Sequence, residues 1–324
     1  MKIKIIALLM FLLPLVLNGQ TITDAKDAYN KGAKVYSSDK DSALIYFEQS
    51  LGICKTVGTE GDSLRMKIET YLPGIYFDIA NAAYKEKKYD EALAKGEKAA
   101  QIADQYKDEK NKLRASKLLI SANFAQANNY FRTNDLENAT KYYEITVKLD
   151  PKLSKAWYNM AQAYMKKGDA EKMGIAMDKT FELAKAENDT ATIGRATKQC
   201  RDFYYKQGLS SFGKNENSSA LTSLNKSLSY DAKFTDAMYI IANIYNKQTK
   251  FKDAIDICNT ALKLETTSPA RFQLLLGYAY VSLKQNGEAC AAYKKVVDSK
   301  DKVYAPQAAE ILKKNPVICE PAVK

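Results

Sequence analysis

The feature that most constrains this chain is a short pattern that returns about every 34 residues. Each copy contains a turn, an apolar or aromatic residue, two polar residues, a small residue and an apolar one. The small residue, replaced once by methionine, marks each copy: Ala92, Ala139, Met173, Ala220, Ala254 and Ala289, with a weaker copy at Ala43. Successive landmarks are 49, 47, 34, 47, 34 and 35 residues apart. Such a period predicts a stack of units, each packed only on its neighbours.

Further residues, nearly all of them small, keep fixed distances from these landmarks. Twelve residues before them stand Ala80, Ala127, Ala161, Gly208, Ala242 and Gly277, and seven after them stand Ala99, Thr146, Thr180, Ser227, Ala261 and Val296. Because two antiparallel helices approach closely only where side chains are small, this pattern predicts one helix-turn-helix per unit. Apolar residues at helical spacing fill the remaining positions, and we therefore predict an all-α fold.

Two segments carry a resemblance to a known family. Residues 157–173 read WYNMAQAYMKKGDAEKM, and residues 142–151 read YYEITVKLDP. Together with the 34-residue step, they resemble tetratricopeptide (TPR) repeats. The resemblance extends from residue 70 to about 303 and implies a right-handed α-solenoid with a concave groove lined by the first helix of each pair.

The spacing also predicts irregularities in this solenoid. Steps of 47 and 49 residues require first helices or connectors about three to four turns longer than standard. Pro73 lies inside an otherwise helical stretch and predicts a kink or a restart there. The segment APQAAEILKKN, with Pro306 in its first turn, predicts a helix that caps the open end of the array.

These observations predict the following order along the chain: a signal peptide (1–19), a degenerate N-terminal TPR-like unit (22–57), a repeat with an extended first helix (62–107), two repeats (110–153 and 154–187), a repeat with an extended first helix or connector (188–234), two further repeats (235–268 and 269–303), a C-terminal capping helix (304–315) and a flexible tail (316–324).

The first residues predict export. Lys2 and Lys4 precede an apolar run from Ile5 to Leu17, and Gly19 follows it closely. This run of thirteen residues, with Pro14 inside it, is too short to cross a bilayer core of about 30 Å as a helix. We therefore expect a signal peptide cleaved near Gly19, no membrane span, and a mature protein that is periplasmic or extracellular.

The absence of histidine argues against catalysis. Without histidine, the chain has no Ser/His or Cys/His nucleophile pair and lacks the usual general base and zinc ligand. The sequence also has no C-x-x-C pair, no glycine-rich phosphate loop and no calcium loop. We expect a protein that is not an enzyme and has neither cofactor nor metal; a hydrolase that uses carboxylates alone is the last alternative.

Five cysteines remain after the predicted cleavage, and an exported protein can form disulfides. The favoured pair is Cys290 with Cys319, because a tail broken by Pro316 and Pro321 can fold back on the last repeat. The alternative is that all the cysteines act as small buried hydrophobic residues, which suits Cys258 especially well.

The chain has 49 lysines and arginines against 38 acidic residues, a formal charge of +11, and only six of the basic residues are arginines. Lysine favours general attraction to acidic surfaces, whereas arginine forks usually read phosphates and base edges. We expect an acidic partner, or peripheral contact with an anionic envelope, and no nucleic acid.

The groove that the resemblance implies can be read from three sets of positions. Fifteen residues before the landmarks lie Phe77, Phe124, Tyr158, Tyr205, Tyr239 and Leu274; eleven before them lie Asn81, Asn128, Gln162, Leu209, Asn243 and Tyr278; and seven before them lie Lys85, Arg132, Lys166, Gly213, Lys247 and Ser282. The rings either anchor a peptide or pack between repeats, and the amides either bind a peptide backbone or are merely solvated. The basic positions favour acidic peptides.

Some members of this family clamp a C-terminal carboxylate with lysines and asparagines spread over three repeats. Asn128, Asn159 and Lys206 fall at compatible positions here. Phe124 and Asp202 occupy positions where the clamp would need lysines, so the match is partial.

The leading hypothesis is a non-enzymatic scaffold or adaptor in the bacterial envelope or secreted fraction, which binds another protein's peptide or helix in the groove between residues 77 and 247. The alternatives are a lysine-rich binder of anionic envelope polymers or lipid head groups, and an envelope-assembly factor. The degenerate first unit and the final helix are expected to be caps.

Overall fold

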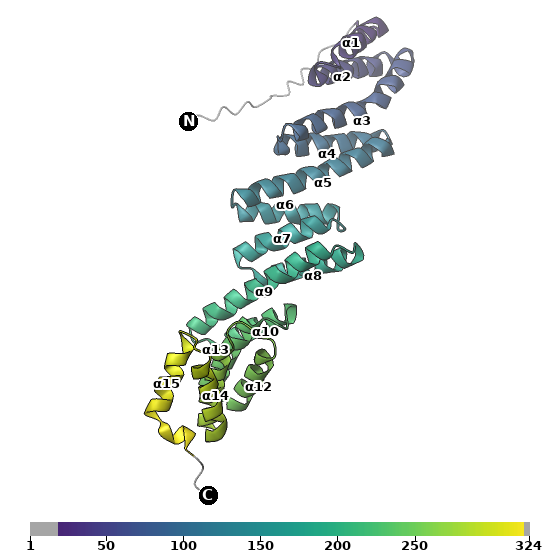
Figure 1. Cartoon of the computed structure of the whole chain (residues 1–324). Helices are drawn as coiled ribbons and strands as arrows, with labels where there is room; N and C mark the ends of the chain where they lie inside the picture. Colours follow the sequence, from purple (N-terminus) through teal and green to yellow (C-terminus); the bar gives the residue numbers. More distant parts are fainter. Residues whose placement is uncertain (1–18, 321–324) are drawn as a thin grey trace, which may run out of the picture. The chain divides into compact units, whose positions relative to one another are not determined.

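The computed structural model describes residues 19–320 (Figure 1). The predicted signal peptide, except Gly19, and the last four residues of the predicted tail lie outside this range. The described chain is all-α, with fifteen α-helices, two short 3-10 segments and no strand. No helix within it is long and apolar enough to cross a membrane.

Consecutive helices pair as the repeat pattern predicts. The first and second helices of the seven pairs are α1 (Ile22–Val35) and α2 (Lys40–Thr56), α3 (Asp62–Lys85) and α4 (Tyr89–Gln105), α5 (Glu109–Arg132) and α6 (Leu136–Leu149), α7 (Ser154–Lys167) and α8 (Ala170–Ala186), α9 (Thr190–Gly213) and α10 (Asn217–Tyr230), α11 (Thr235–Lys247) and α12 (Phe251–Leu262), and α13 (Pro269–Ser282) and α14 (Asn286–Asp298). The helix α15 (Tyr304–Lys314) follows the last pair, and the 3-10 segments are η1 (Gly58–Gly61) and η2 (Pro316–Cys319).

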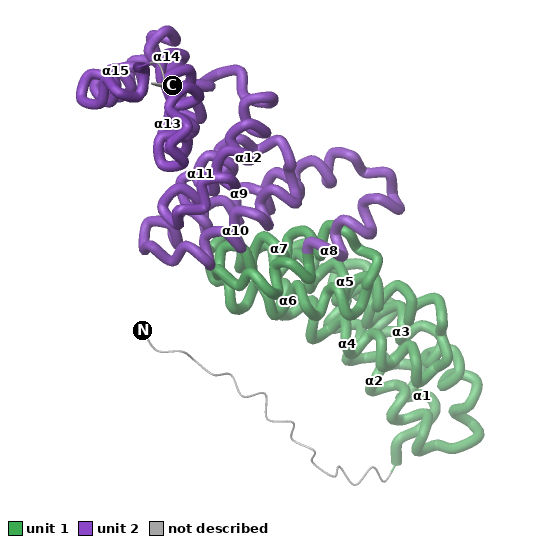
Figure 2. Tube along the Cα trace, turned by 90° about the horizontal axis from the view of Figure 1, so that it is seen from below, with its two compact units in different colours: residues 1–176 green, residues 177–324 purple. Residues whose placement is uncertain are grey.

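The chain divides into two compact units, residues 1–176 and 177–324, and the division falls within α8 (Figure 2). Each unit is an α-solenoid in which helix pairs stack in chain order. Below, unit 1 denotes the residues up to 176 and unit 2 those from 177 onward.

From α3 onward, every turn between a first and a second helix uses the same backbone conformation. The residue five positions before the landmark has a positive φ in all six turns: Lys87, Asn134, Gly168, Asn215, Thr249 and Lys284. A left-handed residue ends a helix by directing the following N–H groups back to its last carbonyls. The Lys88 N–H, for example, donates to the Ala83 carbonyl at 3.0 Å. Only one of these six residues is glycine. The turn is therefore set by its place in the repeat and not by a glycine.

The landmarks lie where the helices of a pair approach most closely. All six, from Ala92 to Ala289, are fully buried, and Met173 fits among them without exposure. The glycines twelve residues earlier show how close the helices are. A Cβ added to Gly208 would lie 2.6 Å from Leu224, and one added to Gly277 would lie 2.5 Å from Tyr293. The repeated small residues therefore mark where the two helices of a pair lie close together.

The longer steps in the sequence correspond to longer first helices. The helices α3, α5 and α9 each have 24 residues, whereas α7 and α13 have 14. The added length is close to three turns. The expected restart at Pro73 is wrong, because α3 continues through this residue from Asp62 to Lys85.

The first helices of neighbouring pairs lie closer together than the second helices do. In unit 1, α3 contacts α5 and α5 contacts α7; in unit 2, α9 contacts α11 and α11 contacts α13. No two second helices in the described range contact each other to this extent. The first helices therefore form the inner side of each stack.

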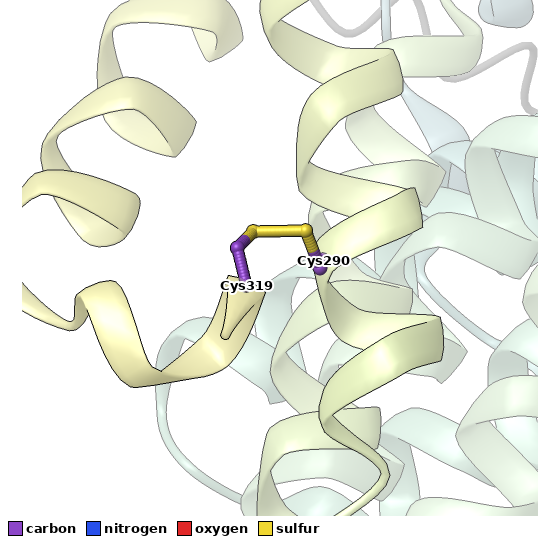
Figure 3. Close-up of a disulfide and its surroundings, with 2 residues drawn as sticks. All are labelled: Cys290 and Cys319. Carbon is purple, nitrogen blue, oxygen red and sulfur yellow. A yellow bond between two sulfur atoms is a disulfide. The ribbon is translucent and has the colours of Figure 1, made fainter. Parts of the chain in front are cut away.

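The C-terminal end is closed by α15 and η2. Ala308 and Ile318 are buried against Tyr293 and Val296 of the last pair. Cys290 on α14 and Cys319 in η2 form a disulfide with an S–S distance of 2.04 Å (Figure 3). Residues 316–319 therefore fold back on the last repeat, as expected for a tail that Cys319 ties down.

The close helix approach predicts opposite effects for two glycines of α9. Gly208→Ala should lower the free energy of unfolding relative to Gly194→Ala by about 1–3 kcal/mol, because its new methyl group overlaps the buried Leu224. Both variants gain the same helix propensity, about 1 kcal/mol, and the Gly194 Cβ would meet open space. Urea unfolding of the two variants checks this, and equal stabilities would contradict the account.

Candidate functional site

We call the mostly aromatic residues fifteen positions before the landmarks the aromatic ladder. In unit 1, its members differ in how much of the ring is exposed. Phe77 is only 9% exposed, and the Arg114 guanidinium covers its ring at 3.9 Å from the centroid. Phe124 is half-buried, with its ring centroid 6.1 Å from that of Tyr143, and Tyr158 is half-buried as well. Phe77 is therefore a packing residue and a correction to the predicted groove, whereas Phe124 and Tyr158 retain surface for a ligand.

In unit 2, the ladder tyrosines pack against aromatic residues of the next repeat. Tyr205 meets Phe234 edge-on with centroids 4.9 Å apart, and Tyr239 meets Phe272 edge-on at 5.9 Å. Both tyrosines are half-buried, and Leu274 packs with the cluster that contains Ala308 of α15. Of the two roles predicted for these rings, packing between repeats accounts for the contacts seen in unit 2.

Arginine side chains hold these ring pairs in place. The Arg271 guanidinium lies 4.9 Å from the Phe272 ring and donates to Asp236 at 2.7 Å and to Glu265. The Glu265 side chain is 5% exposed. Burial alone would raise its pKa, but hydrogen bonds from Thr267, Arg271 and Thr235 outweigh burial and hold the pKa well below its usual range. This buried ion pair stays charged at neutral pH and fixes the junction between α11 and α13.

Some of the predicted amide side chains already form hydrogen bonds within the protein. In unit 1, the Asn128 Oδ1 accepts hydrogen bonds from the Tyr143 hydroxyl at 2.7 Å and from the Asn159 Nδ2 at 2.9 Å. Only the Nδ2 of Asn128 then remains for a ligand, so this side chain offers a donor where the sequence suggested both a donor and an acceptor.

The other members of this set differ from one another. In unit 2, the Asn243 Nδ2 donates to the Tyr239 carbonyl at 2.8 Å, which leaves the Oδ1 free to accept. Asn81 and Gln162 are half-buried in unit 1, while Leu209 and Tyr278 are exposed in unit 2.

The basic residues predicted seven positions before the landmarks are exposed, and two of them are held by contacts with aromatic rings. In unit 1, the Lys166 Nζ lies 4.4 Å from the centroid of Phe131. In unit 2, the Lys247 Nζ lies 4.4 Å from that of Phe212. Each lysine stacks on a ring of the preceding repeat, so cation–π contacts hold these charges along the inner side. Lys85 and Arg132 are also exposed, and Arg132 donates to Asn129 at 3.1 Å.

The residues of the partial carboxylate clamp are divided between the two units. Asn128 and Asn159 bond to each other in unit 1, and Lys206 is an exposed side chain of unit 2. Asp202, at a position where the clamp would need a lysine, pairs with Arg201 at 2.7 Å.

A hollow in unit 1 contains two of the predicted groove residues. It has a volume of about 600 Å³ and is lined by α3, α5 and the loop before α7: Tyr84, Lys117, Ile120, Ser121, Phe124, Ala125, Asn128, Asp150 and Leu153. Tyr84, Ile120 and Leu153 extend the apolar surface beside Phe124. This ladder hollow is the best-defined part of the predicted groove.

A second cavity of unit 1 was not predicted. It has a volume of about 430 Å³, and Tyr29, Tyr36, Asp78, Asn111 and Arg114 are among its lining residues. Two of these come from the degenerate first unit, which the sequence assigned a capping role only. The repeat pattern did not reveal the cavity, because Thr70, Tyr71, Asn111 and Arg114 lie in the parts of α3 and α5 that a standard repeat lacks.

Models of the tetratricopeptide repeat match the chain at residues 124–172 and again at 270–302. The chain therefore contains tetratricopeptide repeats in both units. The two matches fall in different units, and the first covers Phe124, Asn128 and Tyr158. No group of three or more acidic or cysteine side chains in this TPR protein is placed to hold a metal ion within residues 19–320.

Among curated proteins, none matches this TPR chain. Solved structures similar to it include YrrB, described as a TPR protein with an unusual peptide-binding site, at 18% identity and a TM-score of 0.35, covering 58% of this chain and 91% of that one. The TPR2AB domain of yeast Sti1 in complex with pHSP90 is 15% identical with a TM-score of 0.34, covering 91% and 98%. MamA is 19% identical with a TM-score of 0.33, covering 54% and 95%. With scores this low, the likenesses carry no weight for what this TPR protein binds.

The hydrogen bonds of Asn128 predict a non-additive pair of substitutions. Asn128→Ala should lower the free energy of unfolding by about 1–3 kcal/mol, because the fully buried Tyr143 loses the acceptor of its hydroxyl. The same change should cost less in a Tyr143→Phe background, where no hydroxyl is left unpaired. A double-mutant cycle by urea unfolding measures this, and strictly additive losses would show that the bond is not formed.

Proposed function

We propose that this TPR protein is an exported, non-enzymatic adaptor that binds a peptide segment or a helix of a partner protein on the inner side of unit 1. The observation that carries this proposal is the ladder hollow between α3 and α5, where Phe124 and Asn128 stand side by side with a wall of apolar side chains. Concave apolar sites with a few oriented polar groups are the usual form of a binding site.

The groups in the ladder hollow suit a polypeptide ligand. Phe124 and Leu153 offer apolar surface for a side chain, and the Nδ2 of Asn128 can donate to a peptide carbonyl. Two hydrogen bonds already fix the orientation of Asn128, so little side-chain entropy is lost when a ligand binds. Tyr158, fifteen residues before the next landmark, continues the same series of positions.

The remaining parts of the proposal rest on the sequence. The basic residues and apolar run at 2–17 support export, to the periplasm or out of the cell. The formal charge of +11 and the exposed Lys85, Arg132 and Lys166 favour a partner segment with acidic residues. The same lysine excess is what supports the alternative, adsorption to an anionic envelope polymer.

Tyr158→Ala should reduce cross-linked capture of a specific partner from the envelope or secreted fraction about tenfold, because an aromatic anchor is lost. Tyr158→Phe should retain capture, since it keeps the ring. Tyr46→Ala is the matched control, a half-buried tyrosine on the second helix α2. Helix content by circular dichroism should be equal in all three variants.

Two results would contradict the proposal. Equal loss in the Tyr46→Ala and Tyr158→Ala variants would place the interface off the inner side. Capture that vanishes with added salt and ignores Tyr158 would favour adsorption through lysines.

A further inference from the structure

The unpredicted cavity of unit 1 is built by the added turns of the long first helices. The regular helix α7 begins 19 residues before its landmark, whereas α3 and α5 each begin 30 residues before theirs. The added turns are therefore residues 62–72 of α3 and 109–119 of α5. They supply Thr70, Tyr71, Asn111 and Arg114 to the cavity lining. We call this cavity the N-terminal pocket.

Four aromatic residues contribute to the walls of the N-terminal pocket. Tyr29 on α1, Tyr36 just after it, Phe47 on α2 and Tyr71 on α3 line it together with Ile75. At about 430 Å³ its volume lies in the range of sites that enclose a small ligand or a peptide anchor. The pocket therefore has the size and the surface to take up an aromatic side chain.

The charges around the pocket favour an anion. The Lys67 Nζ lies 4.8 Å from the ring centroid of Tyr29, and the Lys40 Nζ lies 5.1 Å from that of Tyr36. The lining contains Arg114 and one carboxylate, Asp78, which already accepts a hydrogen bond from the Tyr36 hydroxyl at 3.0 Å. Each lysine contacts a tyrosine ring, so both ammonium groups lie beside the aromatic side chains of the pocket. The lining itself is balanced, with Arg114 against Asp78, and the excess positive charge comes from Lys40 and Lys67.

Arg114 is held in position with donors to spare. Its guanidinium stacks on Phe77 at 3.9 Å, and its Nη1 donates to the Asn111 Oδ1 at 2.7 Å. Asn111 is itself fixed, because its Nδ2 donates to Asp108 at 2.7 Å. The Arg114 Nη2 forms an ion pair with the Asp78 Oδ1 at 3.6 Å, a distance too long for a good hydrogen bond, so this nitrogen can still donate to a ligand. A stacked guanidinium with a free edge is suited to bind a carboxylate.

The added turns that supply the pocket also carry exposed apolar side chains. Met66 and Tyr71 on the added turns of α3 are 59% and 52% exposed, and Leu113 on the added turns of α5 is 57% exposed. Of these, Tyr71 lines the pocket itself, so its ring is accessible to a ligand.

We propose that the N-terminal pocket binds an acidic peptide segment, with an aromatic side chain between the tyrosine rings and the carboxylate of a neighbouring residue on Arg114. This inference rests on the proposed function, peptide binding, and adds a second site with its own ligand chemistry. A peptide suits the pocket better than a uniform polyanion does, because a polyanion would leave the aromatic walls without a partner.

The test titrates the full mature chain with the capped peptide acetyl-Gly-(4-fluoro-Phe)-Glu-Gly-amide and follows the fluorine NMR signal. We expect saturable binding that weakens about tenfold when the probe's Glu is replaced by Gln. Arg114→Gln should weaken binding of the Glu probe to the same extent, and Tyr71→Ala should weaken it as well. Arg195→Gln is the matched control, because Arg195 is an exposed arginine of α9 that donates to the side chain three residues earlier, as Arg114 does, and it should leave the affinity unchanged.

Several results would overturn this assignment. They are no binding of the Glu probe to the wild-type chain, equal binding of the Glu and Gln probes, or binding that Arg114→Gln and Tyr71→Ala leave unchanged in folded protein. Displacement of the probe by dextran sulfate but not by excess unlabelled acidic peptide would assign the pocket to a polyanion instead. Tyr158→Ala should not affect the probe, so failure here and failure of the ladder hollow are separate outcomes.

Discussion

The close approach of the two helices in each pair is the constraint on which the rest of this structure depends. It requires a small or buried residue at each landmark and at the position twelve residues earlier, as the overlap of an added Cβ at Gly208 or Gly277 shows. Because the landmarks fix where each pair touches, they also fix the left-handed turn five residues before them. Every other position on the first helices is then determined in space, including those that face the inner side.

The surface left by this packing is used in two ways. In unit 2, the inner tyrosines Tyr205 and Tyr239 join one repeat to the next through edge-on ring contacts. In unit 1, Phe124 and Asn128 line a hollow, and the added turns of α3 and α5 create a second cavity with aromatic walls and a fixed guanidinium. The added turns, together with residues of α1 and α2, have therefore given unit 1 a pocket that 14-residue first helices would not form.

The sequence predicted the all-α repeat fold and the longer first helices, because both follow from the spacing of small residues along the chain. The restart expected at Pro73 is absent, because α3 continues through this residue, whereas residues 316–319 are ordered by the Cys290–Cys319 pair that the sequence favoured and by the buried Ile318. The site was harder to predict. Position in the repeat placed Phe77 in the groove, but the Arg114 that covers its ring lies in an added turn outside the periodic pattern. The second bond of Asn128, to Asn159, likewise depends on contact between repeats.

Hydrogen exchange of the protein with and without a captured partner tests the central claim most directly. If the inner side of unit 1 binds the partner, amide protection should increase on the first helices α5 and α7 and in the loop before α7. It should stay unchanged on the second helices α4 and α6 of the same repeats. Protection confined to α4 and α6, with none on α5 and α7, would contradict the account.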